Sequence, residues 1–204
     1  KYDIIILIGD NMLKPYDLVM YDLRSYASPK AKLTQMIRKG EIIRIARGVY
    51  ADSFDDPRLP VAGMLVSPSY VSFETALGYY GCIPERVHAI KSAGFNLNKE
   101  KRFDTPFGLY TFHYIPRNVF PLALTPAEEQ GHGFRLAQKE KALLDTLYKI
   151  RGITTKKGIS DLLFEDLRIN ELVFEELDWE LLSALAPYYR STTINTLIRH
   201  GRNI

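Results

Sequence analysis

Residues 28 to 51, SPKAKLTQMIRKGEIIRIARGVYA, constrain the fold of this chain more than any other stretch. Ser28 ahead of a proline is typical of a helix start, and Gly40 is typical of a helix end. The segment that follows alternates isoleucine with arginine and reaches Arg47-Gly48, a pair that fits a tight hairpin turn. A helix that leads directly into a two-stranded ribbon, with basic residues on both, is typical of a winged helix-turn-helix that binds DNA.

Basic side chains gather in the same part of the chain. The whole sequence has a net charge of +3, and residues 1 to 52 account for all of it, because the remaining 152 residues balance. Residues 24 to 47 carry a net +6, from Arg24, Lys30, Lys32, Arg38, Lys39, Arg44 and Arg47 against Glu41. Such a concentration is the electrostatic pattern of a protein that binds a phosphate backbone. Charge alone leaves a solvated helix face equally open.

The helix expected at residues 29 to 39 has two different faces. Leu33, Met36 and Ile37 cluster on one side, where they would pack on the preceding helices. The opposite side carries Arg, Lys, Gln and Thr, which pair with guanine, adenine or the thymine methyl group in a major groove. We therefore expect two groups of DNA-binding residues: Lys32, Thr34, Gln35 and Arg38 at base edges, and Lys30, Lys39, Arg44 and Arg47 at phosphates or in a minor groove. A winged helix used only for protein contacts is the alternative.

Residues 1 to 52 are expected to form this winged helix-turn-helix domain. The β-branched run within residues 2 to 10 fits a buried strand or a buried helix. After Pro15, apolar residues from Tyr16 to Leu23 have the spacing of a short amphipathic helix. Residues 53 to 66 contain two prolines and neighbouring acidic residues, which we interpret as a linker.

Residues 67 to 204 are expected to form a larger α+β domain with a small, mostly antiparallel sheet. The segment SPSYVSFETALGYYG predicts a helix capped by Ser69 or Ser72, because Tyr70, Phe73 and Leu77 have helical spacing and Gly81 follows. Residues 86–92 and 107–115 alternate like strands, and residues 134–137 add a third short run. Further helices are predicted at 138–150, 155–167, 170–177, 179–186 and 192–200, the last three behind Asn170, Asp178 and Ser191.

Three motifs resemble the AbiEi-type antitoxins of type IV abortive-infection toxin-antitoxin systems. IRKGEIIRIARGVYA resembles the end of that family's winged helix, and QKEKALLDTLYKI resembles its EKALLD helix. SPSYVSFETALGYYG resembles the helix that opens the second domain, although Glu74-Thr75 and Tyr79-Tyr80 depart from the commoner residues. The resemblance implies a DNA-binding transcriptional regulator that represses its own operon at inverted repeats of double-stranded DNA. It also implies a second domain that antagonises a nucleotidyltransferase-like toxin.

Catalytic motifs are absent from the sequence. No D-x-K or E-x-K pair suggests a restriction-type nuclease, and Asp178-Trp179-Glu180 fits a helix start better than a magnesium site. Phosphate-loop, nucleophile-elbow and zinc-protease motifs are also missing. We therefore expect no enzyme, no cofactor and no metal. Two other classes stay open: a nucleic-acid-processing enzyme targeted by its winged helix, and a protein-interaction module that does not bind DNA.

Composition favours a cytoplasmic protein. Cys82 is the single cysteine, which excludes an internal disulfide and fits a reducing compartment. The longest apolar run, Ile4 to Ile8, is far shorter than the roughly 20 residues of a membrane span. Residues 161 to 180 carry eight acidic residues against Arg168, a pattern that fits either a docking face for a basic partner or a set of solvated helices.

Overall fold

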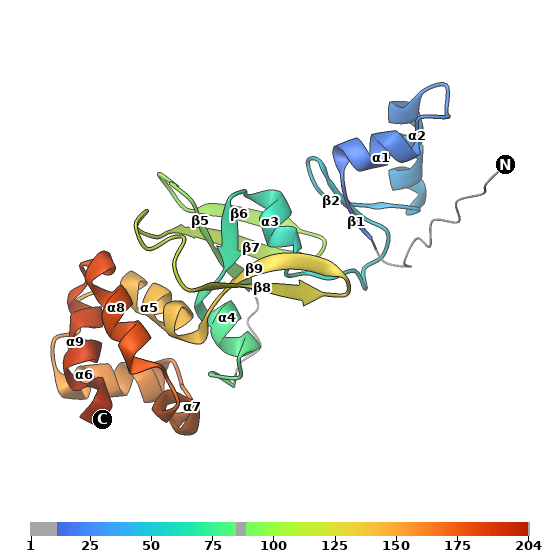
Figure 1. Cartoon of the computed structure of the whole chain (residues 1–204). Helices are drawn as coiled ribbons and strands as arrows, with labels where there is room; N and C mark the ends of the chain where they lie inside the picture. The colour runs from blue at the N-terminus through green and yellow to red at the C-terminus, as the bar shows by residue number, and fades with distance from the viewer. Residues whose placement is uncertain (1–11, 85–88, 204) are drawn as a thin grey trace.

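The computed structural model describes residues 12–84 and 89–203, which form a mixed α+β structure with two sheets (Figure 1). The expected α+β class is therefore confirmed. The apolar run at residues 2 to 10, for which a strand and a helix both stayed open, lies outside the described residues. The first two helices stand at one end of the view and the last helices at the other (Figure 1).

The N-terminal part combines two helices with a small antiparallel sheet of strand order β1-β3-β2. Its elements are β1 (Leu13–Pro15), α1 (Tyr16–Asp22), α2 (Pro29–Lys39), β2 (Ile43–Ala46) and β3 (Val49–Ala51). Both predicted helices and the two-residue turn at Arg47-Gly48 are confirmed. The pairing of β1 with β3 was not expected, and it brings the start of α1 beside the hairpin.

The larger sheet has the strand order β6-β7-β5-β4-β9-β8. Its strands are β4 (Ser69–Val71), β5 (Ala89–Gly94), β6 (Lys101–Thr105), β7 (Gly108–Tyr114), β8 (Leu124–Glu129) and β9 (His132–Ala137). The β4/β5, β6/β7 and β8/β9 pairs are antiparallel, whereas β5/β7 and β4/β9 are parallel. The sheet is therefore mixed, with antiparallel hairpins at both edges.

Of the two helix starts that stayed open, Ser72 is confirmed as the residue before the helix, whereas the assignment of Tyr70 to the helix was wrong. Residues Ser69–Val71 form β4, in which Tyr70 pairs with Ala93 of β5 and Val71 with Leu136 of β9. The helix α4 begins only at Phe73 and spans Phe73–Tyr79. Because β4 has a neighbour on each side and all of its residues are buried, it lacks the alternation of a half-exposed strand.

The helices of the C-terminal part follow the sequence predictions closely. They are α5 (Lys139–Lys149), α6 (Lys156–Asp161) with a π-helical continuation (Leu162–Asp166), α7 (Glu171–Glu175), α8 (Trp179–Tyr189), α9 (Thr192–His200) and a closing 3₁₀ turn (Gly201–Asn203). The three expected caps are confirmed: the side chains of Asn170, Asp178 and Ser191 each accept a hydrogen bond from a backbone N–H in the first turn of the following helix.

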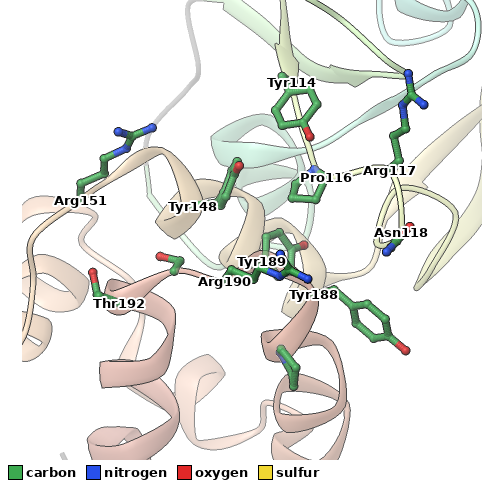
Figure 2. A pocket seen from close by; sticks show the side chains of 12 residues that line it. Tyr114, Pro116, Arg117, Asn118, Tyr148, Arg151, Tyr188, Tyr189, Arg190 and Thr192 are labelled. Carbon is green, nitrogen blue, oxygen red and sulfur yellow. The ribbon is translucent and has the colours of Figure 1, made fainter.

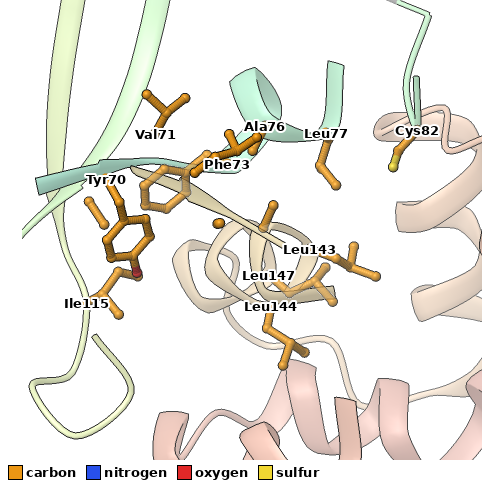
Figure 3. Close-up of a cluster of buried hydrophobic side chains, with 14 of the residues drawn as sticks. Tyr70, Val71, Phe73, Ala76, Leu77, Cys82, Ile115, Leu143, Leu144 and Leu147 are labelled. Atoms are coloured by element: carbon orange, nitrogen blue, oxygen red, sulfur yellow. The ribbon is translucent and has the colours of Figure 1, made fainter. Parts of the chain in front are cut away.

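The main hydrophobic core lies between the larger sheet and its helices. Leu143, Leu144 and Leu147 of α5 are buried in the same cluster as Tyr70 and Leu77 (Figure 3). The N-terminal sheet joins this core through Leu13, Ile45, Val49 and Ala51. The segment interpreted as a linker contains α3 (Val61–Leu65), whose first two residues are fully buried there.

A smaller, separate core supports the two N-terminal helices. It contains Val19, Leu23, Leu33, Ile42 and Tyr50, with Tyr16, Met20, Met36 and Ile37 packed around it. The side of α2 predicted to be apolar therefore faces inward, and its other side faces solvent.

The main core also encloses a charged pair. Lys141 and Asp145 on α5 are both fully buried, with 3.8 Å between Nζ and Oδ1. The Asp145 carboxylate accepts hydrogen bonds from the hydroxyls of Tyr70 (3.0 Å), Ser72 (2.7 Å) and Tyr189 (2.6 Å). Because Tyr189 is the last residue of α8, this carboxylate ties the end of α8 to β4 and α5.

Candidate nucleic-acid interface

Helix α2 presents a polar face on a well-defined frame. Pro29 occupies its first turn, and Gly40 ends it with φ of +71°, a conformation that glycine adopts without steric cost. Leu33 fixes the inner side, while Thr34, Gln35 and Arg38 are exposed on the outer side. The Thr34 hydroxyl donates to the Lys30 carbonyl at 3.0 Å, so its oxygen can still accept a hydrogen bond.

The β2–β3 hairpin presents two arginines beside that face. Gly48 has φ of +85°, which a tight two-residue turn requires, and Arg47 stands exposed next to it. The Gly48 carbonyl accepts a hydrogen bond from the backbone N–H of Tyr16 at 3.0 Å, so the hairpin tip is held against the start of α1. Arg44 is exposed on β2, one residue before the register of the β2–β3 ladder shifts.

A depression of about 620 Å³ lies between α2 and the hairpin. Three of the eight residues predicted to bind DNA line it, namely Thr34, Arg44 and Arg47. Tyr16 and Tyr50 line it as well, and the sequence analysis did not single them out. Their only signal in the sequence is their position: Tyr16 directly follows Pro15 at a predicted helix start, and Tyr50 lies in the VYA segment that forms β3. Gln35 and Arg38 are exposed on α2 but do not line the depression.

Two of the predicted lysines share a carboxylate. Glu41 lies 4.0 Å from the Lys32 ammonium and 3.7 Å from the Lys39 ammonium. Lys32 also lies 5.2 Å from the centre of the Tyr26 ring. Both lysines are therefore partly neutralised within the protein, in contrast to Lys30.

The other four cations of the interface lack such a carboxylate partner among the described residues. Within residues 12–84 and 89–203, no carboxylate pairs with Lys30, Arg38, Arg44 or Arg47. Arg38 and Lys39 also suit the negative end of the α2 dipole, a structural role that needs no ligand. Arg44 and Arg47 have no such explanation, because they lie on a hairpin.

Other parts of the described chain offer little catalytic chemistry. No group of three or more His, Cys, Asp or Glu residues that could hold a metal ion occurs in residues 12–84 and 89–203. His113 lies between Glu100 (2.7 Å) and Thr111 (3.1 Å), with the edge of its ring near Phe73. Glu74 pairs with Lys91, and Glu140 accepts from the backbone N–H of Asp178, so neither joins Lys141 and Asp145 in one site. None of the helices in the described part is long and apolar enough to cross a membrane.

Comparison with known proteins gives no functional assignment. The sequence matches no family model, and no curated protein matches it. One similar solved structure is described as "Crystal structure of putative nucleotidyltransferase from H. pylori", with a TM-score of 0.36 and 14% sequence identity. The match covers 64% of this chain and 72% of that chain. A likeness at this level carries no argument about activity.

Proposed function

We propose that this protein is a cytoplasmic DNA-binding regulator in which residues 12–51 act as a winged helix-turn-helix. Helix α2 would enter the major groove with Gln35 and Arg38 toward base edges. The β2–β3 hairpin would act as the wing, with Arg44 and Arg47 at phosphates or in the adjacent minor groove.

One observation carries the proposal. Arg44 and Arg47 of the hairpin and Thr34 of α2 line the same depression, although the hairpin follows α2 in the chain and could have pointed elsewhere. None of the described carboxylates pairs with either arginine, so both charges are available to an anionic ligand. A surface with exposed hydrogen-bonding side chains on a helix and free guanidinium groups beside it fits duplex DNA well.

The biological role is proposed from the motif resemblance. If the chain acts as AbiEi-type antitoxins do, it represses its own operon at inverted repeats and antagonises a nucleotidyltransferase-like toxin. Co-expression with the product of the adjacent gene tests the second part. The role is supported if the adjacent gene product arrests growth and this chain relieves the arrest. It is contradicted if that product does not slow growth, or if growth stays arrested when this chain is present.

DNA binding is tested by its dependence on salt. Three unpaired phosphate contacts per copy, from Lys30, Arg44 and Arg47, give a slope of log K against log salt of about −2.7, so affinity should fall roughly 40-fold between about 50 and 200 mM salt. The measurement is fluorescence anisotropy with a labelled duplex from the protein's own promoter region. Salt-insensitive binding, or no preference for that duplex over an unrelated one, would refute the proposal.

Two variants divide the proposed contacts into classes. Arg47→Ala should weaken binding to every duplex alike and reduce the salt slope by about one unit. Gln35→Ala should leave the slope unchanged and reduce the preference for the promoter duplex. Arg151→Ala is the matched control, because Arg151 is an exposed arginine in the loop after α5. Helix α5 lies far from α2 (Figure 1). The Arg151→Ala variant should bind DNA as the unaltered protein does.

A further inference from the structure

A cavity larger than the depression beside α2 lies far from that helix, where three segments of the chain meet. Its volume is about 880 Å³, within the range of small-molecule sites. It is lined by the end of β7 and the turn after it, by the end of α5, and by the junction between α8 and α9 (Figure 2). Each of these segments brings one arginine: Arg117, Arg151 and Arg190.

The lining of this cavity is cationic. No aspartate or glutamate is among its lining residues, so the three guanidinium groups give it a formal charge of +3. Arg117 donates to the side-chain oxygen of Asn96, which holds its guanidinium in place. Arg151 and Arg190 have no carboxylate partner in the part of the chain that the structure describes. An anionic ligand would therefore meet arginines that are already oriented or free to turn toward it.

Aromatic rings stand between the arginines. Tyr114, Tyr148, Tyr188 and Tyr189 line the same cavity, and Tyr114 and Tyr188 are 39% and 46% exposed. Burial raises the pKa of the Tyr148 hydroxyl, and Tyr114 raises it further, whereas Arg151 lowers it. Exposed tyrosine faces are surfaces on which a planar ring can stack.

The junction between α8 and α9 adds two further features. Arg190 has φ of +50°, a left-handed conformation in which glycine is the usual residue, so the chain holds an arginine here at a conformational cost. The next two residues, Ser191 and Thr192, line the cavity at the N-terminus of α9. Helix N-termini carry unpaired N–H groups and a partial positive charge, which favour phosphate.

The buried Asp145 carboxylate fixes this geometry. It accepts the Tyr189 hydroxyl at 2.6 Å, and Tyr189 directly precedes Arg190. The end of α8 is thereby held to α5, whose own end supplies Tyr148 and leads to Arg151. Cationic and aromatic groups from segments far apart in the sequence thus line one fixed cavity.

We propose that this cavity binds a nucleoside phosphate, with the phosphates held by Arg117, Arg151 and Arg190 and the base stacked on a tyrosine ring. The site is independent of the proposed DNA interface and shares no residue with it. Three cations account for a polyanionic group, and the tyrosines account for a planar one. A nucleotide combines both in a volume that the cavity accommodates.

The test is isothermal titration calorimetry on the full chain without DNA. The ligands are ATP, GTP, CTP and UTP, with adenosine as a ligand without phosphate, tripolyphosphate as a ligand without a base, and a short single-stranded oligonucleotide. At least one nucleotide should bind with a dissociation constant below about 100 μM, tighter than adenosine, tripolyphosphate and the oligonucleotide. If no nucleotide binds saturably at concentrations up to about 1 mM, the proposal is overturned. It is also overturned if tripolyphosphate, adenosine or the oligonucleotide binds as tightly as every nucleotide.

Two arginine variants locate the site. Arg190→Gly removes a guanidinium while supplying the residue that a left-handed position favours, so the thermal midpoint should stay the same or rise. Nucleotide affinity should fall at least about tenfold, the loss expected for one charge-assisted contact. Arg151→Ala, at an exposed position, should weaken binding by a similar factor.

The chain offers a matched control for Arg190→Gly. Arg168 also has a left-handed backbone, with φ of +54°, but it does not line the cavity. Arg168→Gly makes the same exchange of charge and conformation elsewhere, and it should keep full nucleotide affinity. Equal losses in both variants would overturn the assignment, because they would show an effect of overall charge. Arg47→Ala should also bind nucleotides normally, so failure of the DNA proposal and failure of this one are distinguishable.

Discussion

Replacement of Lys141 by methionine tests whether the buried charged cluster stabilises the fold. Methionine keeps the length of an unbranched side chain and removes the ammonium group, which donates to the Val119 carbonyl at 2.8 Å and lies 3.8 Å from Asp145. Asp145 would remain fully buried without its cation. Removing one partner of a buried pair costs about 3–5 kcal/mol. At about 2–4 °C per kcal/mol for a chain of this size, the thermal midpoint should fall by roughly 6–20 °C.

The loss of stability in Lys141→Met should depend on pH in a defined direction. Burial raises the pKa of Asp145, and Lys141 opposes that rise, so the pKa should be higher still in Lys141→Met. A carboxyl group whose pKa is higher in the folded state binds protons more tightly there, so lowering the pH through that pKa stabilises the folded state relative to the unfolded one. The difference in stability between the variant and the unaltered protein should therefore narrow as the pH falls through the raised pKa of Asp145 in the variant.

Urea unfolding followed by circular dichroism at several pH values measures both effects. Lys149→Met is the matched control, because Lys149 is on the same helix but is 39% exposed and pairs with the exposed Glu100. Lys149→Met should lower the free energy of unfolding by less than about 1 kcal/mol. If Lys141→Met also costs less than about 1 kcal/mol, or if its deficit stays constant with pH, the account of Asp145 as a buried acceptor that depends on Lys141 is wrong.

Three further predictions concern other parts of the chain. Gly201→Ala should lower the free energy of unfolding by about 1–3 kcal/mol in urea titrations, because a β-carbon there would overlap the Trp179 ring. Gly48→Ala should cost about 1–2 kcal/mol by the same measurement, because the hairpin turn holds this residue at φ of +85°; an unchanged stability would mean that the turn can relax. Glu41→Gln should tighten DNA binding and steepen its salt dependence in anisotropy titrations, since it frees two lysines.

Sequence patterns predicted the elements whose signals are local. Helices α7, α8 and α9 begin behind Asn170, Asp178 and Ser191 as expected, because a capping side chain acts on backbone groups two or three residues away. The α2 helix and the Arg47-Gly48 turn were predictable for the same reason. Their start, end and turn residues lie within the segment itself.

Three strands whose position depends on distant partners, β4, β6 and β8, were not predicted. Strand β4 is buried by strands from later in the chain, so Tyr70 looked like part of the helical spacing that continues to Leu77. Strand β8 contains Pro126, which argues against a strand in general but is tolerated at the edge of a sheet. Strand β6, with the sequence KRFDT, is also an edge strand and is mostly polar.

The same limit applies to the candidate sites. The exposure of Gln35 and Arg38 followed from helix periodicity. The sharing of Glu41 by Lys32 and Lys39 depends on how the chain turns after Gly40, and periodicity does not contain that information. The arginine cavity could not be predicted at all, because its residues come from segments that only the folded chain brings together.

The N-terminal sheet has consequences for dividing this protein into fragments. Tyr50 of β3 supports α1 and α2 together with Ile42, which directly precedes β2, whereas Ile45 and Val49 of the sheet belong to the core of the larger part. A fragment that ended after Ala51 would keep only the smaller core and would leave those apolar side chains in water, a loss that few small domains can tolerate. Helix α2 therefore depends on the rest of the chain for its stability. If an isolated N-terminal fragment failed to bind DNA, the result would reflect the loss of folding and would not test the proposed recognition.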